Sequence, residues 1–117
     1  MLPKACRIRL KRDFERIFDF RRSVSGRFVR FACAPAGLPK QSISRFGIVT
    51  SAKVSKRAVV RNRLRRRVRV AIAEALPFLK PPLDIVIICQ PAAAKCTADE
   101  FREDIRIALG KIFSIRL

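Results

Sequence analysis

Residues 56–76 combine a dense positive charge with a helical pattern of apolar residues. The first 14 residues, KRAVVRNRLRRRVR, contain eight Lys or Arg and no acid, and the last seven, VAIAEAL, hold one charge, Glu74. On a helix at about 100° per residue, six apolar side chains fall within roughly a third of the circumference. These are Val60, Leu64, Val68, Ala71, Ile72 and Ala75. The pattern predicts a helix over residues 58–76 with one face in a hydrophobic core.

The other face of this helix carries cations. Like charges four residues apart destabilise a helix, so a solvated face normally mixes signs. Arg61, Arg65 and Arg69 repeat at that spacing without an acid between them. Because the planar guanidinium group suits bidentate contacts with phosphate, we interpret this face as a phosphate-binding surface rather than a solvated one. The side chains opposite the apolar stripe are Asn62, Arg63, Arg66 and Arg69, with Arg65 and Arg67 flanking them.

The charge of the whole chain points the same way. The 117 residues carry 27 Lys and Arg against nine Asp and Glu, and half are apolar. This composition fits a single domain over residues 1–117 rather than a disordered basic tail. A formal net charge of +18 indicates a polyanionic partner, either nucleic acid or an anionic membrane surface. The membrane alternative fails on length, because the longest charge-free run, residues 85–94, is shorter than the about 20 residues of a spanning helix.

Periodicity and turn residues predict an α+β sandwich in the order helix, strands, helix, strand, helix. Besides the helix above, the expected elements are a helix over residues 9–22 and strands over residues 27–33, 45–51 and 83–90. The first two strands flank a loop with Pro and Gly, residues 34–44, and are expected to pair as a long-looped hairpin. The N-terminus lacks the apolar segment of a secretory signal, so a cytoplasmic protein is expected.

A last helix is predicted to begin at TADE. Thr97 and Glu100 have the spacing of a capping box, in which each side chain bonds to the other residue's backbone N–H group. Helical spacing continues through the side chains expected on the inner face, which are Phe101, Ile105, Ala108, Leu109 and Ile112.

The four cysteines do not have the spacing of a metal site. Cys6, Cys33, Cys89 and Cys96 form no C-x-x-C pair, and the chain has no His. They are expected to be small buried hydrophobes or exposed free thiols, with no metal bound.

The segment AVVRNRLRRRVR resembles the R-N-R signature of the bacterial ribonuclease P protein subunit. RLKRDFERIF resembles that family's first helix, RFGIVTSAKV its strand before the signature, and DIVIICQPAA its strand after it. The resemblance implies a fold like the second domain of ribosomal protein S5. It also implies a protein subunit of ribonuclease P, with the catalytic RNA and precursor tRNA as partners and no protein partner required. The RNA would remove the 5′ leader by Mg²⁺-dependent hydrolysis, with Mg²⁺ held mainly by the RNA and the substrate.

The resemblance also implies site residues. Phe14, Phe18 and Phe31 match the aromatic cleft that holds the single-stranded leader, although an aromatic pair four residues apart is more typical of a core. The sequence departs from the family pattern at two positions before the charged helix. Ala52 stands where a second lysine is usual. Ser55 stands where Gly is usual, and the segment around it, VSKRAVV, is one residue longer than the common pattern. The expected RNA-binding residues are Lys53, Lys56, Arg57, Arg61, Asn62, Arg63, Arg65, Arg66 and Arg69.

No catalytic side chain is expected in the protein itself. The chain lacks His and Tyr, and its nine carboxylates are scattered apart from short pairs near the last helix. One alternative is a non-enzymatic RNA-binding protein of ribosomal type, without a leader cleft. A second is a protein-only nuclease, which would require clustered acids or a His.

Overall fold

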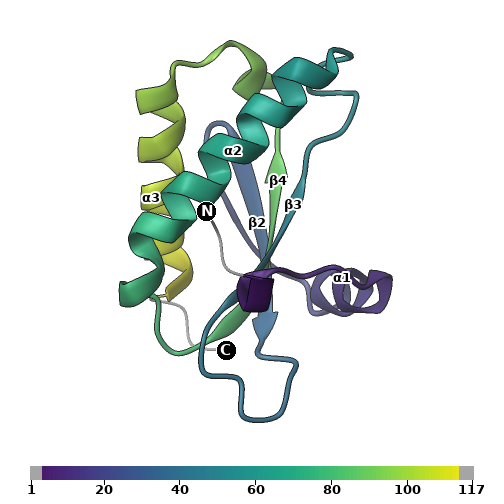
Figure 1. Ribbon diagram of the computed structural model, residues 1–117, viewed down its shortest axis with the longest axis vertical. Coiled ribbons are helices and arrows are strands. Elements are labelled where there is room, and N and C mark those ends of the chain that lie inside the picture. Colours follow the sequence, from purple (N-terminus) through teal and green to yellow (C-terminus); the bar gives the residue numbers. More distant parts are fainter. Residues whose placement is uncertain (1–3, 114–117) are drawn as a thin grey trace.

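The computed structural model describes residues 4–113, which form one mixed sheet with helices on both faces (Figure 1). The elements are α1 (Lys11–Asp19), β1 (Arg22–Ser25), β2 (Val29–Pro35), β3 (Arg45–Val49), α2 (Ala58–Ala75), β4 (Leu83–Cys89) and α3 (Ala98–Phe113). Short 3-10 turns lie at Lys4–Cys6, Leu76–Phe78 and Pro91–Lys95. This arrangement confirms the predicted α+β sandwich.

The strand order is β1-β2-β4-β3, so β4 lies between the two strands expected to form a hairpin. β2 pairs antiparallel with β4, and β3 pairs parallel with β4. The predicted pairing of residues 27–33 with 45–51 is therefore wrong. Most of β4 is buried toward both faces of the sheet, and such a strand belongs in the centre, with a neighbour on each side.

The edge strand β1 was not predicted, and the first helix was expected to continue to residue 22. Instead α1 ends at Asp19, where the N–H groups of Phe20 and Arg21 donate to the carbonyls of Arg16 and Phe18. Arg21 takes a left-handed φ of 58°, which turns the chain into β1. The sequence of β1, RSVS, has one apolar side chain and so lacks the alternation that signals a strand.

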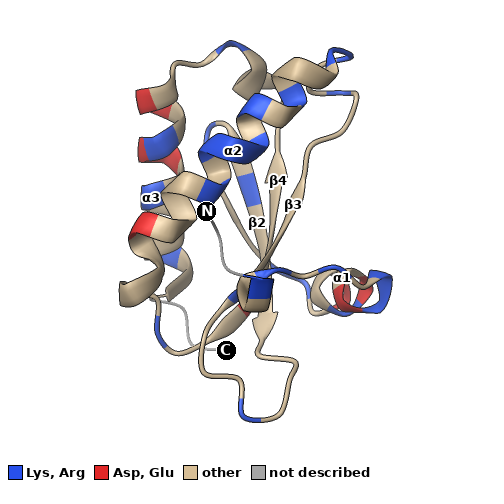
Figure 2. Cartoon of the chain, in the orientation of Figure 1, with Lys and Arg blue, Asp and Glu red and all other residues tan. Residues whose placement is uncertain are grey.

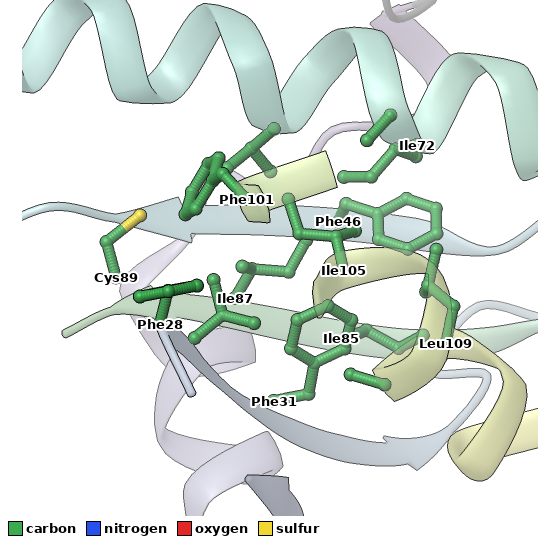
Figure 3. Close-up of a cluster of buried hydrophobic side chains, with 14 of the residues drawn as sticks. Phe28, Phe31, Phe46, Ile72, Ile85, Ile87, Cys89, Phe101, Ile105 and Leu109 are labelled. Carbon is green, nitrogen blue, oxygen red and sulfur yellow. The ribbon is translucent and has the colours of Figure 1, made fainter. Parts of the chain in front are cut away.

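One face of the sheet, which we call the thick face, packs against α2 and α3 (Figures 1 and 3). The predicted stripe of α2 points into this core, with Ala75 half-buried at its end, and the predicted inner face of α3 is buried. The capping box is confirmed, because Glu100 N–H donates to Thr97 Oγ1 at 3.1 Å and Thr97 N–H donates to Glu100 Oε1 at 2.9 Å. The largest fully buried side chains of this core are Phe31, Phe46, Leu64, Ile72, Ile85, Ile87, Phe101, Ile105 and Ile112.

The opposite face, which we call the thin face, packs against α1 through small side chains. Ile17 of α1 rests in a cluster with Ala32 and Ala34 of β2. The ring of Phe14 lies over Gly47 of β3, where an added Cβ would be 2.6 Å from Phe14 Cε1. Glycine at this position therefore allows α1 to approach the sheet closely.

A buried carboxylate on α3 holds the turn between β1 and β2. The N–H groups of Arg27, Phe28 and Val29 donate to the carboxylate oxygens of Asp104 at 2.8, 2.9 and 3.2 Å. A Cβ on Gly26 would lie 2.5 Å from one of these oxygens, so glycine leaves room for the carboxylate.

The cysteines are free thiols. Cys6, Cys33 and Cys89 are buried among apolar side chains and Cys96 is half-buried, in line with the expected packing role. Burial raises the pKa of each of these thiols. Within residues 4–113, no helix has both the length and the apolar character needed to span a membrane.

Candidate nucleic-acid interface

The arginines of α2 form two rows on either side of its buried stripe, and Figure 2 shows these cations along the helix. We call Arg61, Arg65 and Arg69 the loop-side row, because two of them bond to the loop before the helix. Arg61 Nη1 donates to the carbonyl of Ser55 at 2.9 Å, and Arg65 Nη2 donates to that of Thr50 at 3.4 Å. These bonds hold the two guanidinium groups in fixed positions.

Two arginines of the loop-side row lie beside one aromatic residue of α1. Arg65 and Arg69 line a pocket of about 270 Å³ together with Phe14, Arg7 and Arg9. The structure therefore brings the charged helix and one predicted aromatic residue to a shared concave surface. Asn62, which was predicted to bind RNA, is exposed and accepts a hydrogen bond from Arg65 Nη1 at 3.1 Å.

The second row, Arg63, Arg66 and Arg67, faces α3 and is here called the α3-side row. Arg63 and Arg66 make no hydrogen bond or ion pair with any group in residues 4–113. The three side chains line a groove of about 450 Å³ between α2 and α3, which we call the α2–α3 groove. Its remaining walls are Val70, Ala71, Ala98, Asp99 and Arg102.

The loop before α2 has ordinary backbone geometry despite its two departures from the family pattern. Ser55 does not have a positive φ, so a glycine is not needed there. Its Oγ accepts the N–H of Arg57 at 3.2 Å, at the start of a helix that has no other side-chain cap. Val54 is buried and anchors the loop, and Ala52 is exposed. The predicted RNA-binding residues Lys53, Lys56 and Arg57 are all exposed beside the loop-side row.

The three predicted cleft aromatics do not lie on one surface. Phe14 is half-buried on the thin face, and Phe18, one turn later on α1, is 41% exposed. Phe31 is 0% exposed and belongs to the core of the thick face (Figure 3). Its assignment to the cleft is wrong because successive side chains of β2 alternate between faces, and the large ring takes the side with more space.

A row of side chains on the thin face, beyond the part that α1 covers, was missed by the sequence analysis. The register places Ser25, Arg30, Ile88 and Val49 side by side across the four strands. We call them the open row, since Ser25 and Arg30 are exposed and Ile88 and Val49 are only half-buried. Their signal in the sequence is weak, because the apolar members look like core residues.

The position of α1 on the thin face depends on Asp84 of β4, which is 0% exposed. Arg45 donates to its carboxylate from Nε at 3.0 Å and from Nη2 at 2.7 Å, and Arg16 of α1 also bonds to it. Gln41 Nε2 and the N–H of Gly37 donate at 2.9 and 3.0 Å. Burial raises the pKa of the Asp84 carboxyl, but hydrogen bonds from Arg45 and Gln41 and the charges of Arg45 and Arg16 outweigh burial. Its pKa therefore lies below the usual range.

This network is occupied by protein partners, so it does not resemble a metal site. Within residues 4–113, no group of three or more His, Cys, Asp or Glu side chains is arranged to hold a metal ion. Asp104, the other buried carboxylate, is likewise bonded to backbone N–H groups. Both buried carboxylates are therefore already bonded to protein groups.

The chain resembles known proteins over nearly its whole length. The family model Ribonuclease P matches residues 2–113. The ribonuclease P protein component of a Cyanothece species is 32% identical over 124 residues, covering 95% of each chain. The ribonuclease P protein of Staphylococcus aureus is 26% identical, with a TM-score of 0.83 over 93% of this chain and 96% of that one. The Thermotoga maritima protein is 27% identical, with a TM-score of 0.78 over 95% and 98%. From this match in sequence and fold, the chain belongs to the ribonuclease P protein family.

Proposed function

We propose that this protein binds the catalytic RNA of ribonuclease P and the 5′ leader of precursor tRNA. The RNA then removes the leader by Mg²⁺-dependent hydrolysis, with Mg²⁺ held mainly by the RNA and the substrate. The proposal places the protein in the cytoplasm with its tRNA substrates. The observation that carries it is that Arg65 and Arg69 of the loop-side row line one pocket together with Phe14.

The two parts of this surface have different ligands. The arginines and the exposed cations of the preceding loop bind phosphates, which gives affinity without reading sequence. Phe14, Phe18 and the open row form a surface where unpaired bases stack and the cation of Arg30 contacts the backbone. A single strand that lies on the thin face can thus contact α1 and the sheet at once. This geometry favours a leader strand over a folded duplex.

The activity test is reconstitution with a ribonuclease P RNA at low Mg²⁺. We expect the protein to accelerate cleavage at the 5′ end of precursor tRNA. A structural RNA-binding protein of ribosomal type would bind RNA without this acceleration. Binding without faster cleavage would therefore favour that alternative.

The leader path is tested by Phe18→Ala, with Phe20→Ala as the matched control. The two rings are 41% and 42% exposed and lie two residues apart, so they point in different directions. Stacking on an aromatic ring contributes about 1–3 kcal/mol per base, and it requires unpaired bases. Phe18→Ala should weaken binding of precursor tRNA by the holoenzyme and leave mature tRNA nearly unaffected. The measurement is the ratio of the affinities for precursor and mature tRNA. If this ratio is the same for Phe18→Ala as for Phe20→Ala, Phe18 does not contact the leader.

A further inference from the structure

The α2–α3 groove has an apolar floor and a cationic rim. The floor consists of Val70, Ala71 and Ala98, and Val70 is 53% exposed although it is a large aliphatic residue. The rim carries guanidinium groups from the α3-side row and from Arg102. The volume of about 450 Å³ lies within the range of about 300–1,000 Å³ that is usual for small-ligand sites.

Only part of the positive charge of this rim is neutralised by groups in residues 4–113. Arg63 and Arg66 have no hydrogen-bonding or ion-pair partner within residues 4–113. Arg102 is held by Glu74 across the two helices, with Nη2 and Oε2 2.7 Å apart, and Asp99 is the one acid in the groove wall. The groove therefore favours an anionic ligand, and the apolar floor requires that this ligand also present an apolar surface.

We propose that the α2–α3 groove binds an unpaired nucleotide of the catalytic RNA. Phosphates contact the rim, where guanidinium groups bind them in bidentate fashion. The base lies against the floor, with its faces available to the arginine planes, which stack on bases. Asp99 accepts hydrogen bonds from amino groups on the base edge. A duplex would contact the rim but would leave the floor unused.

The position of the groove assigns it to the catalytic RNA rather than to the leader. The groove lies between α2 and α3 on the thick face, whereas Phe14 and the open row lie on the thin face. Figure 1 shows the sheet between α1 and the pair α2 and α3. This inference rests on the proposed function. It adds a second contact with the catalytic RNA, separate from the one made by the loop-side row. It also assigns a role to Arg67 and Arg102, which the sequence analysis did not include among the RNA-binding residues.

The test separates the rim from the floor. Arg67→Ala removes a cation from the rim, and Ala98→Leu fills the groove without changing its charge. The control for the lost charge is Arg12→Ala, at an exposed site on α1. Arg67→Ala should reduce the slope of log affinity against log salt by about one more than the control does. Ala98→Leu should lower affinity for the catalytic RNA by roughly five- to tenfold at an unchanged slope. Thermal melting checks that both variants fold.

Chemical probing of the RNA with 2′-hydroxyl acylating reagents locates the nucleotide. Wild-type protein should protect one or a few unpaired nucleotides that become reactive again with Ala98→Leu. If Ala98→Leu binds as the wild type does, or if no nucleotide changes reactivity, the groove does not hold a nucleotide, while the proposed function stands. If the wild-type protein neither binds the RNA nor accelerates cleavage, the proposed function itself fails.

Discussion

The thick face of the sheet is closed by large side chains under two helices, whereas the thin face is closed by small side chains and one ion network. Phe31 and Ile87 on the thick face meet Leu64 and Phe101, all without exposure. On the thin face, Ala32, Ala34 and Gly47 allow α1 to lie close, and part of the face stays open. The larger buried core of the thick face therefore provides most of the stability, whereas the thin face buries less area and keeps an accessible surface.

The largest effect is expected from a cavity on the thick face. Leu64→Ala should lower the free energy of unfolding by about 2–5 kcal/mol, because a fully buried leucine leaves a void that the two helices cannot close. Chemical denaturation measures the loss, and Val59→Ala is the control, because Val59 is on the same helix, is 61% exposed and does not line the α2–α3 groove. RNA affinity should fall in proportion to the unfolded fraction. If Leu64→Ala melts like the wild type but binds RNA poorly, Leu64 contacts RNA, and the buried and RNA-binding faces of α2 have been assigned wrongly.

The next effect is expected from the ion network of the thin face. Asp84→Ala leaves the buried Arg45 with only its longer ion pair to Asp13, at 3.5 Å, and should cost about 3 kcal/mol. Arg16, the other cation of the network, can still reach solvent. Hydrogen exchange should show α1 losing protection while α2 and α3 keep theirs. Equal loss of protection in all three helices would mean that the two faces unfold as one unit.

Acid titration sharpens the same prediction. The pKa of Asp84 is lower in the folded state than in the unfolded state, where it is about 3.9. The ionised carboxylate therefore stabilises the fold above the unfolded-state pKa, and this stabilisation is lost as the pH falls through the folded-state pKa. The stability difference between wild type and Asp84→Ala should therefore narrow below about pH 4. A difference that stays constant from pH 6 to acid would contradict the role of the ionised carboxylate.

The smallest effect is expected where the ring of Phe14 meets the sheet. Gly47→Ala puts a methyl group 2.6 Å from the ring and should cost about 1–3 kcal/mol by forcing α1 outward. Gly110→Ala, where nothing lies within 4 Å, is the matched control and should not destabilise the protein. The displaced ring should also reduce the preference for precursor over mature tRNA. An unchanged preference would show that the ring position does not matter for the leader.

Much of the fold follows from the sequence because its helices carry strong periodic signals. The stripe of α2, the inner face of α3 and the capping box are local patterns, and the structure confirms them. The hairpin was mispredicted because strand pairing is not local, and β4 enters between β2 and β3 from about forty residues later along the chain. The polar edge strand β1 has no apolar pattern to detect.

The candidate site was predictable in composition but not in geometry. Helical spacing identified the arginines of α2, yet it could not show that one row bonds to the preceding loop while the other lines a groove. The face that each β2 side chain takes was also ambiguous, since Phe31 and Ala32 are both apolar. Their sizes decide it, because the large ring requires the deep core and the small methyl group fits beneath α1.

The carboxylate of Asp104 connects the two surfaces that we propose to bind RNA. It joins α3, which forms one wall of the α2–α3 groove, to the turn that leads into β2 and the open row. Three backbone N–H groups donate to this one carboxylate, so the β1–β2 turn is bonded to α3 without any ligand. An RNA that contacts both surfaces thus meets a preset spacing between them, and the entropy lost on binding belongs mostly to the RNA.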